Sequence, residues 1–456
     1  MTKKMWGGRF IKKMNPVAEE FTKSIRYDYK LARYDLIGSM MHVSILARVG
    51  YLKSSEASKL LNGLEEIYAK VEKGSFGPDL REEDIHTQIQ NVLQDKVGDI
   101  ALKLHTAISL NDQVVFATKL YCKDNILKIR KKIWNVANAI SLLADKNKDV
   151  VIPGYTHLRR AQPVYLKDYL RTYTEMLGRD DKRLGDINGN MKITIGAGAL
   201  AGTPIHSREY GSSPWSLLKK KGLMDLKDAL NLQMTENSID AVSDRDFVIE
   251  IISALSIAAM HLSRLAEDFI IWSTKEFDLL DIDESFCTGS SLMPHKKNPD
   301  SLELIRGYSG RIYGNLVSVL TMMKGLPLAY NRDMQLDKEP LFDSFEILGM
   351  ELEILKDLIA TLKFNENAIG PALRDESLYT TDIVYYLVDK GVPFKSAHTI
   401  VGKIVRHSSE SGIPIKDMSE GRLKRFSARI VKNEILRLFD PHLSVRSKRS
   451  VNRAKR

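Results

Sequence analysis

The segment TGSSLMPHKKNP, residues 288–299, gathers groups that could act on an anionic substrate. Ser290 offers a hydroxyl beside Gly289, while Lys296 and Asn298 offer a positive charge and an amide. A serine becomes a base or a nucleophile only where its alkoxide is stabilised, which cations, amides and backbone N–H groups can do. The segment holds no G-x-S-x-G elbow, so it does not indicate an α/β-hydrolase triad. The alternative interpretation is a polar surface loop whose serine caps a helix.

A second polar cluster, GYTHLRRAQP at 154–163, places Thr156 and His157 between Pro153 and Pro163. Histidine titrates near neutral pH and can serve as an acid or a base. A packed or exposed histidine without a chemical role is the alternative. No second histidine stands at metal-ligand spacing from it, so we expect no metal site.

Two further clusters indicate a site only when they are taken together with the first two. In KLHTAISLNDQV, residues 103–114, polar side chains stand inside a helical pattern; they are Ser109, Asn111, Asp112 and Gln113. The segment LAYNRDMQLDKE, residues 328–339, adds Tyr330, Gln335 and Lys338. Each cluster alone could be ordinary surface polarity. Their combination favours one site built from distant parts of the chain.

Long helices must position these clusters. Residues 99–152 and 223–288 contain no Gly or Pro, and residues 248–272 repeat apolar side chains at steps of three and four. This spacing predicts long helices in a bundle, and Gly and Pro gather where the helices break. KDVVIPGY, at 148–155, is a candidate short strand. GAGALAG, at 196–202, predicts a turn or a close helix approach rather than a dinucleotide loop.

Composition limits the class of protein. The 456 residues are 43% apolar and 28% charged, which predicts a folded soluble protein of two or three domains. The chain has no run of 18 or more uncharged apolar residues, so we expect no membrane-spanning helix. The first residues lack the apolar region of a secretory signal. Two cysteines cannot build a disulfide framework or a Cys-based zinc site, so we expect a cytoplasmic protein.

The net charge of +10 depends strongly on the tail after Asp440. That tail holds six basic residues and no acid, and subtracting those six from +10 leaves +4 for the remainder. We expect a solvated, frayed terminus. The alternative is an electrostatic arm for RNA, a membrane or a partner. No aromatic residue interleaves with these charges, so nucleic-acid binding is not favoured.

Taken together, these segments resemble the argininosuccinate lyase family of the aspartase/fumarase superfamily. The superfamily signature G-S-x-x-M-x-x-K-x-N matches at Gly289, Ser290, Met293, Lys296 and Asn298. The resemblance covers nearly the whole chain. It is carried by MWGGRF, FTKSIRYD, EEDIHTQ, LHTAISLNDQV, GYTHLRRAQP, GALAGTP, AVSDRDF, TGSSLMPHKKNPD and GLPLAYNRDMQLDKE.

The resemblance implies an all-α, three-domain fold. Its parts would be an N-terminal helical domain at 1–110, a central long-helix bundle at 111–361 and a small C-terminal helical domain at 362–456. It also implies a homotetramer whose active sites each draw on three subunits. The implied reaction is the reversible cleavage of argininosuccinate to arginine and fumarate, without a cofactor or a metal.

The resemblance also assigns roles to residues. Its catalytic pair is His157 and Ser290, and which of them takes the proton stays open. Residues expected to hold the fumarate portion are Ser109, Asn111 and Thr156. The succinyl carboxylates would be bound by Lys296 and Asn298. Residues expected to hold the arginine portion are Ser24, Asp28, Tyr330, Gln335 and Lys338.

The chain departs from the family pattern beside two of these segments. Ala107 stands where the family has Gly, and Ile108 and Leu110 stand where it has Arg. Arg159 stands where Gln is usual, and we hypothesise that it restores one of the lost charges. Two other interpretations of the chain stay open: a lyase for another N-substituted aspartate, and a catalytically weakened homologue with a structural or binding role.

Overall fold

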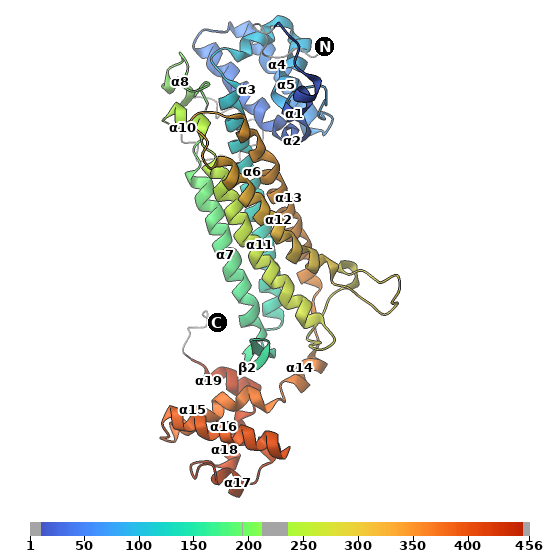
Figure 1. The fold of residues 1–456 in the computed structure, drawn as a ribbon, viewed down its shortest axis with the longest axis vertical. Helices are drawn as coiled ribbons and strands as arrows, with labels where there is room; N and C mark the ends of the chain where they lie inside the picture. The colour runs from blue at the N-terminus through green and yellow to red at the C-terminus, as the bar shows by residue number, and fades with distance from the viewer. Residues whose placement is uncertain (1–10, 194, 212–235, 450–456) are drawn as a thin grey trace. The chain divides into compact units, whose positions relative to one another are not determined.

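A computed structural model describes residues 11–193, 195–211 and 236–449 of the chain. The MWGGRF start and the last seven residues lie outside these ranges. Helices make up most of the described chain (Figure 1), so the predicted all-α class is confirmed. The strands within these ranges form two small antiparallel pairs, β1 (Val151–Thr156) with β2 (Arg159–Tyr165), and β3 (Leu280–Asp281) with β4 (Lys363–Phe364). The short strand predicted near residue 151 is β1.

Five long helices correspond to the predicted bundle helices. They are α6 (Leu110–Lys146), α7 (Leu166–Asn190), α11 (Asp246–Ser273), α12 (Asp300–Met323) and α13 (Lys338–Thr361). The apolar residues predicted to share one face of α11, from Val248 to Trp272, are all buried. By length and composition α11 could cross a membrane, but its apolar window is 61% buried inside the protein. It is therefore a core helix.

The chain divides into two compact units, and each long helix contributes a part to both. Unit 1 comprises residues 1–133, 179–260 and 307–351; unit 2 comprises residues 134–178, 261–306 and 352–456. The three domain ranges expected from the resemblance stay a prediction.

Unit 1 contains the N-terminal helices. They are α1 (Pro16–Thr22), α2 (Ile25–Asp28), α3 (Ala32–Arg48), α4 (Ser54–Glu72) and α5 (Ile85–Val97), followed by a 3-10 helix at Gly98–His105. Most of α3 is buried, and it contacts both α4 and α5. Gly63 lets α4 approach α5, since a Cβ there would lie 2.8 Å from a Leu93 methyl. Later in the chain, unit 1 holds α8 (Ser207–Gly211), α10 (Ser238–Ser243) and a 3-10 helix at Arg332–Asp337.

Unit 2 contains the shorter helices predicted after Leu362. They are α14 (Glu366–Ala372), α15 (Thr380–Asp389), α16 (Phe394–Ser411), α17 (Glu420–Lys424), α18 (Lys432–Leu438) and α19 (Pro441–Ser447). Their apolar faces meet in one core that includes Ile383, Leu387, Val401 and Ile404. The β1–β2 hairpin contacts α14 and α19.

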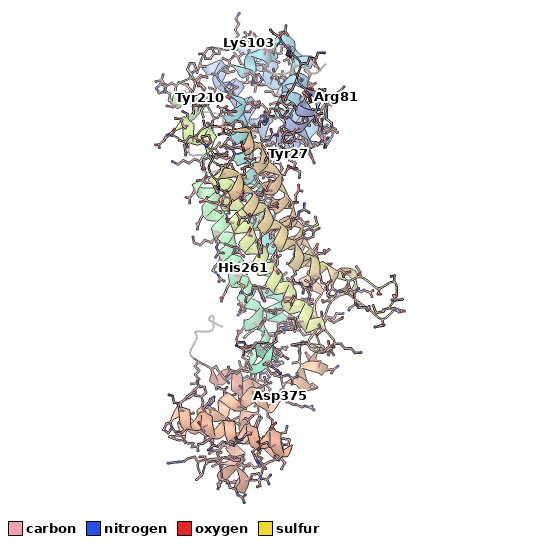
Figure 2. All side chains as sticks on the ribbon, in the orientation of Figure 1. Tyr27, Arg81, Lys103, Tyr210, His261 and Asp375 are labelled. Atoms are coloured by element: carbon pink, nitrogen blue, oxygen red, sulfur yellow. The ribbon has the colours of Figure 1, made fainter. Side chains whose placement is uncertain are left out.

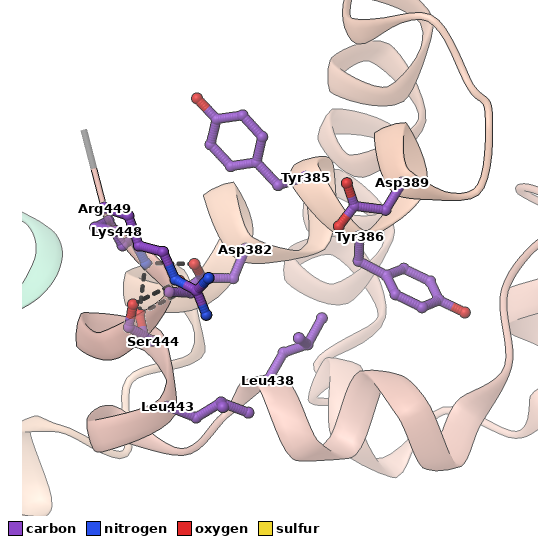
Figure 3. Close-up of a pocket in the computed structure, with 10 residues that line it drawn as sticks. Asp382, Tyr385, Tyr386, Asp389, Leu438, Leu443, Ser444, Lys448 and Arg449 are labelled. Carbon is purple, nitrogen blue, oxygen red and sulfur yellow. Dashed lines mark hydrogen bonds and ion pairs between the residues drawn. The ribbon is translucent and has the colours of Figure 1, made fainter.

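The prediction of a frayed tail after Asp440 is wrong for residues 441–449. Asp440 caps α19 by accepting a hydrogen bond of 2.8 Å from the Leu443 N–H, and Ser444 and Val445 are buried. Lys448 forms an ion pair with Asp382 and donates to the Ser444 hydroxyl over 2.8 Å (Figure 3). An N-cap, an apolar contact and a buried charge partner are enough to dock this basic segment as a helix.

Candidate active site

The predicted catalytic histidine lies at the tip of the β1–β2 hairpin. The register pairs Thr156 with Arg159, so His157 and Leu158 form a two-residue turn, and both have φ of 55°. Such turns favour Asn and Gly because a side chain with positive φ is strained. Neither type is present here, and the strained residue is an exposed histidine. Strain of this kind is typical of functional sites, which favours a chemical role for His157.

The base of this hairpin is held by contacts within unit 2. The rings of Tyr155 and Phe277 lie 5.1 Å apart, and Arg160 Nη1 donates to Asp375 Oδ2 over 3.0 Å (Asp375 is labelled in Figure 2). A hollow of about 430 Å³ opens beside these contacts. It is lined by Tyr155, Leu158, Arg159, Arg160, Glu276, Phe277, Asp375 and Ser377. The tip that carries His157 therefore rests on a fixed support.

The loop from Thr288 to Asn298 lies between α11 and α12 in the sequence and projects to the side of these helices (Figure 1); backbone hydrogen bonds close its base. Thr288 N–H donates to Asn298 O over 3.0 Å, and Asn298 N–H donates to Thr288 O over 2.8 Å. Lys297 and Lys296 are both exposed, and Lys297 Nζ forms an ion pair with Asp281 Oδ1 at 2.6 Å. The loop therefore has an anchored base, and Lys296 adds an exposed positive charge two residues before Asn298.

Ser290 lies inside this loop and accepts two backbone hydrogen bonds. Its Oγ accepts from the N–H groups of Leu292, at 3.3 Å, and Met293, at 3.0 Å. The pattern resembles a helix cap, but no helix follows until α12 begins at Asp300, so the capping interpretation is wrong. Two N–H groups aimed at one hydroxyl oxygen would stabilise negative charge on it. The geometry therefore suits an oxygen that loses its proton.

In unit 1, the cluster of Ser109, Asn111 and Asp112 lies at the start of α6. The expectation that these side chains stand inside a helix is confirmed for Asn111 and Asp112, whereas Ser109 lies just before α6, which begins at Leu110. Ser109 Oγ accepts from the Asn111 N–H at 3.3 Å, and Asn111 Nδ2 donates to Ala199 O at 3.5 Å. Asn and Ser favour helix starts because their side chains bond free backbone groups there.

Asp112 joins this helix start to the glycine-rich segment. Its Oδ2 accepts from the N–H groups of Gly196, at 3.2 Å, and Gly198, at 2.9 Å. Gly198 has φ of 62°, and a Cβ there would lie 2.6 Å from the Gly202 carbonyl oxygen. Burial raises the pKa of Asp112 to about 6, although these N–H groups oppose the shift. The turn predicted at 196–202 is confirmed. Its contact with Asp112 was not predicted from the sequence.

The five residues expected to hold the arginine portion come together in unit 1. Ser24 Oγ donates to Asp28 Oδ2 over 2.5 Å, and Gln335 Nε2 donates to Thr22 O over 3.3 Å. Gln335 also forms a hydrogen bond with Tyr27, which is labelled in Figure 2. The Lys338 ammonium is close enough to Asp28 to lower the pKa of that carboxyl. Tyr330, which is half-buried, follows Ala329, whose φ is 67°.

Burial and nearby charges together raise the pKa values of two residues in this cluster, Asp28 and His86. Burial raises the pKa of Asp28 to about 6, with a further rise from Asp84 and partial opposition from His86. Burial disfavours a charged His86, but Asp35, 2.7 Å from its Nδ1, and the neighbouring Asp84 outweigh that cost and raise the pKa of His86 to about 9. The cluster therefore keeps a buried cation beside a carboxyl that ionises near neutral pH.

A buried ion pair next to this cluster was also not predicted from the sequence. Arg245 Nε donates to Asp337 Oδ2 over 2.7 Å, and Lys338 Nζ donates to Asp337 Oδ1 over 2.8 Å. Arg245 and Asp337 are each 99% buried. Asp337 thus fixes Lys338, and Arg245 fixes Asp337. The available signal was the charged AVSDRDF motif, which points to a partner without showing which one.

Comparison with known proteins places this architecture among the lyases. The family model described as Lyase matches residues 8–314, and the one described as Argininosuccinate lyase C-terminal matches residues 377–446. A class II fumarase structure from Schistosoma mansoni shares the fold, with a TM-score of 0.80 at 16% identity over 94% of each chain.

Curated relatives narrow the class further. The argininosuccinate lyase of Caldanaerobacter subterraneus subsp. tengcongensis is 44% identical over 94% of this chain and 94% of its own. That of Syntrophotalea carbinolica is 43% identical over 99% of this chain and 95% of its own. The chain belongs to the argininosuccinate lyase family, which confirms the resemblance.

Proposed function

We propose that this lyase cleaves argininosuccinate reversibly into arginine and fumarate. The carrying observation is the similarity to curated argininosuccinate lyases along almost the entire chain. In this elimination a base takes a proton from the carbon next to a carboxylate, and that bond's electrons form the double bond of fumarate. The carbon–nitrogen bond breaks, its electron pair stays on the nitrogen, and an acid supplies the proton that completes arginine. The reaction needs no oxidant or reductant.

The residues supply what these steps require. One of Ser290 and His157 takes the proton from carbon, and the other supplies a proton to the leaving nitrogen. The two N–H groups that face Ser290 Oγ support an alkoxide at that position. Lys296 and Asn298 bind the succinyl carboxylates, where negative charge builds as the proton leaves. Thr156, Asn111 and Ser109 hold the fumarate portion. Ser24, Asp28, Tyr330, Gln335 and Lys338 hold the arginine portion.

We further propose that the chain works as a cytoplasmic homotetramer with each active site shared by three copies. Support comes from α12, which exposes apolar side chains at helical spacing within unit 1, namely Tyr313, Val317 and Leu320. An uncovered apolar stripe on a core helix favours association. Cys122 and Cys287 form no disulfide, which suits a reducing compartment.

Fumarate release from argininosuccinate, followed by absorbance, tests the activity. We expect steady release by the assembled protein, and a fall of at least about a hundredfold in kcat for Ser290→Ala. Ser291→Ala is the matched control because it removes a neighbouring, exposed hydroxyl. A correctly assembled protein that releases no fumarate would refute the proposed activity and favour a structural or binding role. Equal losses in the two variants would refute the role of Ser290.

A further inference from the structure

Two consecutive arginines on the β1–β2 hairpin have different surroundings. Arg160 is bound on one side by Asp375, at 3.0 Å, and also bonds Tyr155. Arg159 is exposed, and its side chain makes no ion pair or hydrogen bond with the described residues. Its guanidinium is therefore available to a ligand, whereas that of Arg160 is already used to support the hairpin.

The register places Arg159 on the same face as a proposed substrate residue. Arg159 is the cross-strand partner of Thr156, and partners in antiparallel strands point to the same side with Cβ atoms about 5 Å apart. Arg160 pairs with Tyr155, on the opposite face. Arg159 also lies two residues after His157, which the strained turn presents to solvent. One short segment thus brings a hydroxyl, an imidazole and an uncommitted guanidinium to the same tip.

The segment that begins α6, by contrast, presents no cation of its own between Thr106 and Gln113. Its side chains there are Ala107, Ile108, Ser109, Leu110, Asn111 and Asp112. A substrate portion with two carboxylates needs opposing positive charge, because an unpaired carboxylate is costly to remove from water. A guanidinium suits this task because its fork of N–H groups matches a carboxylate.

We propose that Arg159 is a substrate-binding and specificity-determining residue that binds a carboxylate of the dicarboxylic portion of the substrate. It selects ligands with two carboxylates over those with one. The inference rests on the proposed function, in which Thr156 holds the fumarate portion. It adds a binding cation to the residues expected from the superfamily signature.

The test compares Arg159→Gln with the intact assembled protein, with argininosuccinate as substrate and succinate as the dicarboxylate probe. We expect KM for argininosuccinate and the inhibition constant of succinate to rise about tenfold to a hundredfold, as for the loss of a charged hydrogen bond. kcat should stay within about threefold, since the interaction is made in the ground state as well. Arg159→Lys should recover part of the binding. Lys403→Gln, which removes an exposed charge from α16, should change neither constant.

Thermal midpoints separate binding from stability. Arg159→Gln should leave the midpoint unchanged, whereas Arg160→Gln should lower it by removing the bond to Asp375. Succinate binding, measured by calorimetry, gives a readout that does not need turnover. If the intact protein binds succinate but does not cleave argininosuccinate, the proposed function fails while weaker binding by Arg159→Gln still supports this inference. If both succinate binding and KM of Arg159→Gln stay within twofold of the intact protein, Arg159 does not bind substrate. Absence of succinate binding by the intact protein would also overturn the inference.

Discussion

Asp28 is the carboxyl whose charge changes near neutral pH in the cluster proposed to hold the arginine portion. It lies between Ser24, the Ile85 N–H, His86, Asp84 and Lys338. Burial raises its pKa to about 6, so below that pH it is neutral and cannot pair with a guanidinium. We therefore expect kcat/KM for argininosuccinate to rise as pH increases through about 6 and then to level off.

A pH profile from 5 to 8 checks this expectation, with Asp28→Asn as the comparison. The variant should have a lower plateau and lose the break near pH 6; a break that persists in it would assign the titration to another group. Stability should move in the opposite sense. A carboxyl whose pKa is raised by folding stabilises the folded chain most below about pH 4, and this contribution is lost as pH rises through 6.

Ala107 is a residue whose effect on stability follows from its backbone conformation. Its φ is 57°, a conformation that costs an L side chain roughly 1–2 kcal/mol and glycine much less. Ala107→Gly should therefore raise the free energy of unfolding by about 1 kcal/mol, measured as a shift of the urea midpoint. Ala139→Gly, inside α6, should lower it by about 1 kcal/mol, because glycine is unfavourable within a helix. Shifts of the same sign in both variants would contradict this explanation.

At the scale of elements, local sequence patterns predicted only those features that residues close together in the sequence determine. The apolar spacing from Val248 to Trp272 identified the buried face of α11, because helical periodicity depends only on adjacent turns. The strained turn at His157 could not be foreseen, since the HL pair has no preference for positive φ. The bond between Arg245 and Asp337 joins residues 92 apart, and no local pattern selects one aspartate among several. The fold class was therefore predictable, whereas the partners that fix the site residues were not.

The helix α19 shows how a buried charge can dock a basic segment, and it gives the prediction at this scale. Deleting residues 441–456 would remove Ser444 and Lys448 from Asp382, whose side chain is only 7% exposed. An unpaired buried carboxylate costs about 3–5 kcal/mol, so the thermal midpoint should fall by several degrees. Deleting only residues 450–456 should leave the midpoint unchanged. Equal midpoints for the two truncations would show that α19 adds nothing to the stability of unit 2.

At the scale of the whole molecule, the proposed roles are divided between the two compact units of the chain. His157 and Ser290 belong to unit 2, whereas the residues proposed for the arginine portion belong to unit 1. If each active site draws on three copies, damage to one residue in one copy can be compensated by an intact residue from another. A site shared between copies can therefore regain activity when two inactive variants are combined, whereas a site contained in one chain cannot.

Mixing two inactive variants, Ser290→Ala and His157→Asn, tests this sharing. After the mixture is dissociated and reassembled, we expect activity in up to about one quarter of the sites, because random assembly gives that share of sites both intact residues when they come from different copies. The matched control reassembles each variant alone and should stay inactive. Val317→Asp on the exposed stripe of α12 should reduce both assembly and activity, whereas Leu436→Asp, on an exposed leucine of α18, should reduce neither. Molar mass by light scattering reports assembly. A mixture that assembles but recovers no activity would place His157 and Ser290 of each site on the same copy.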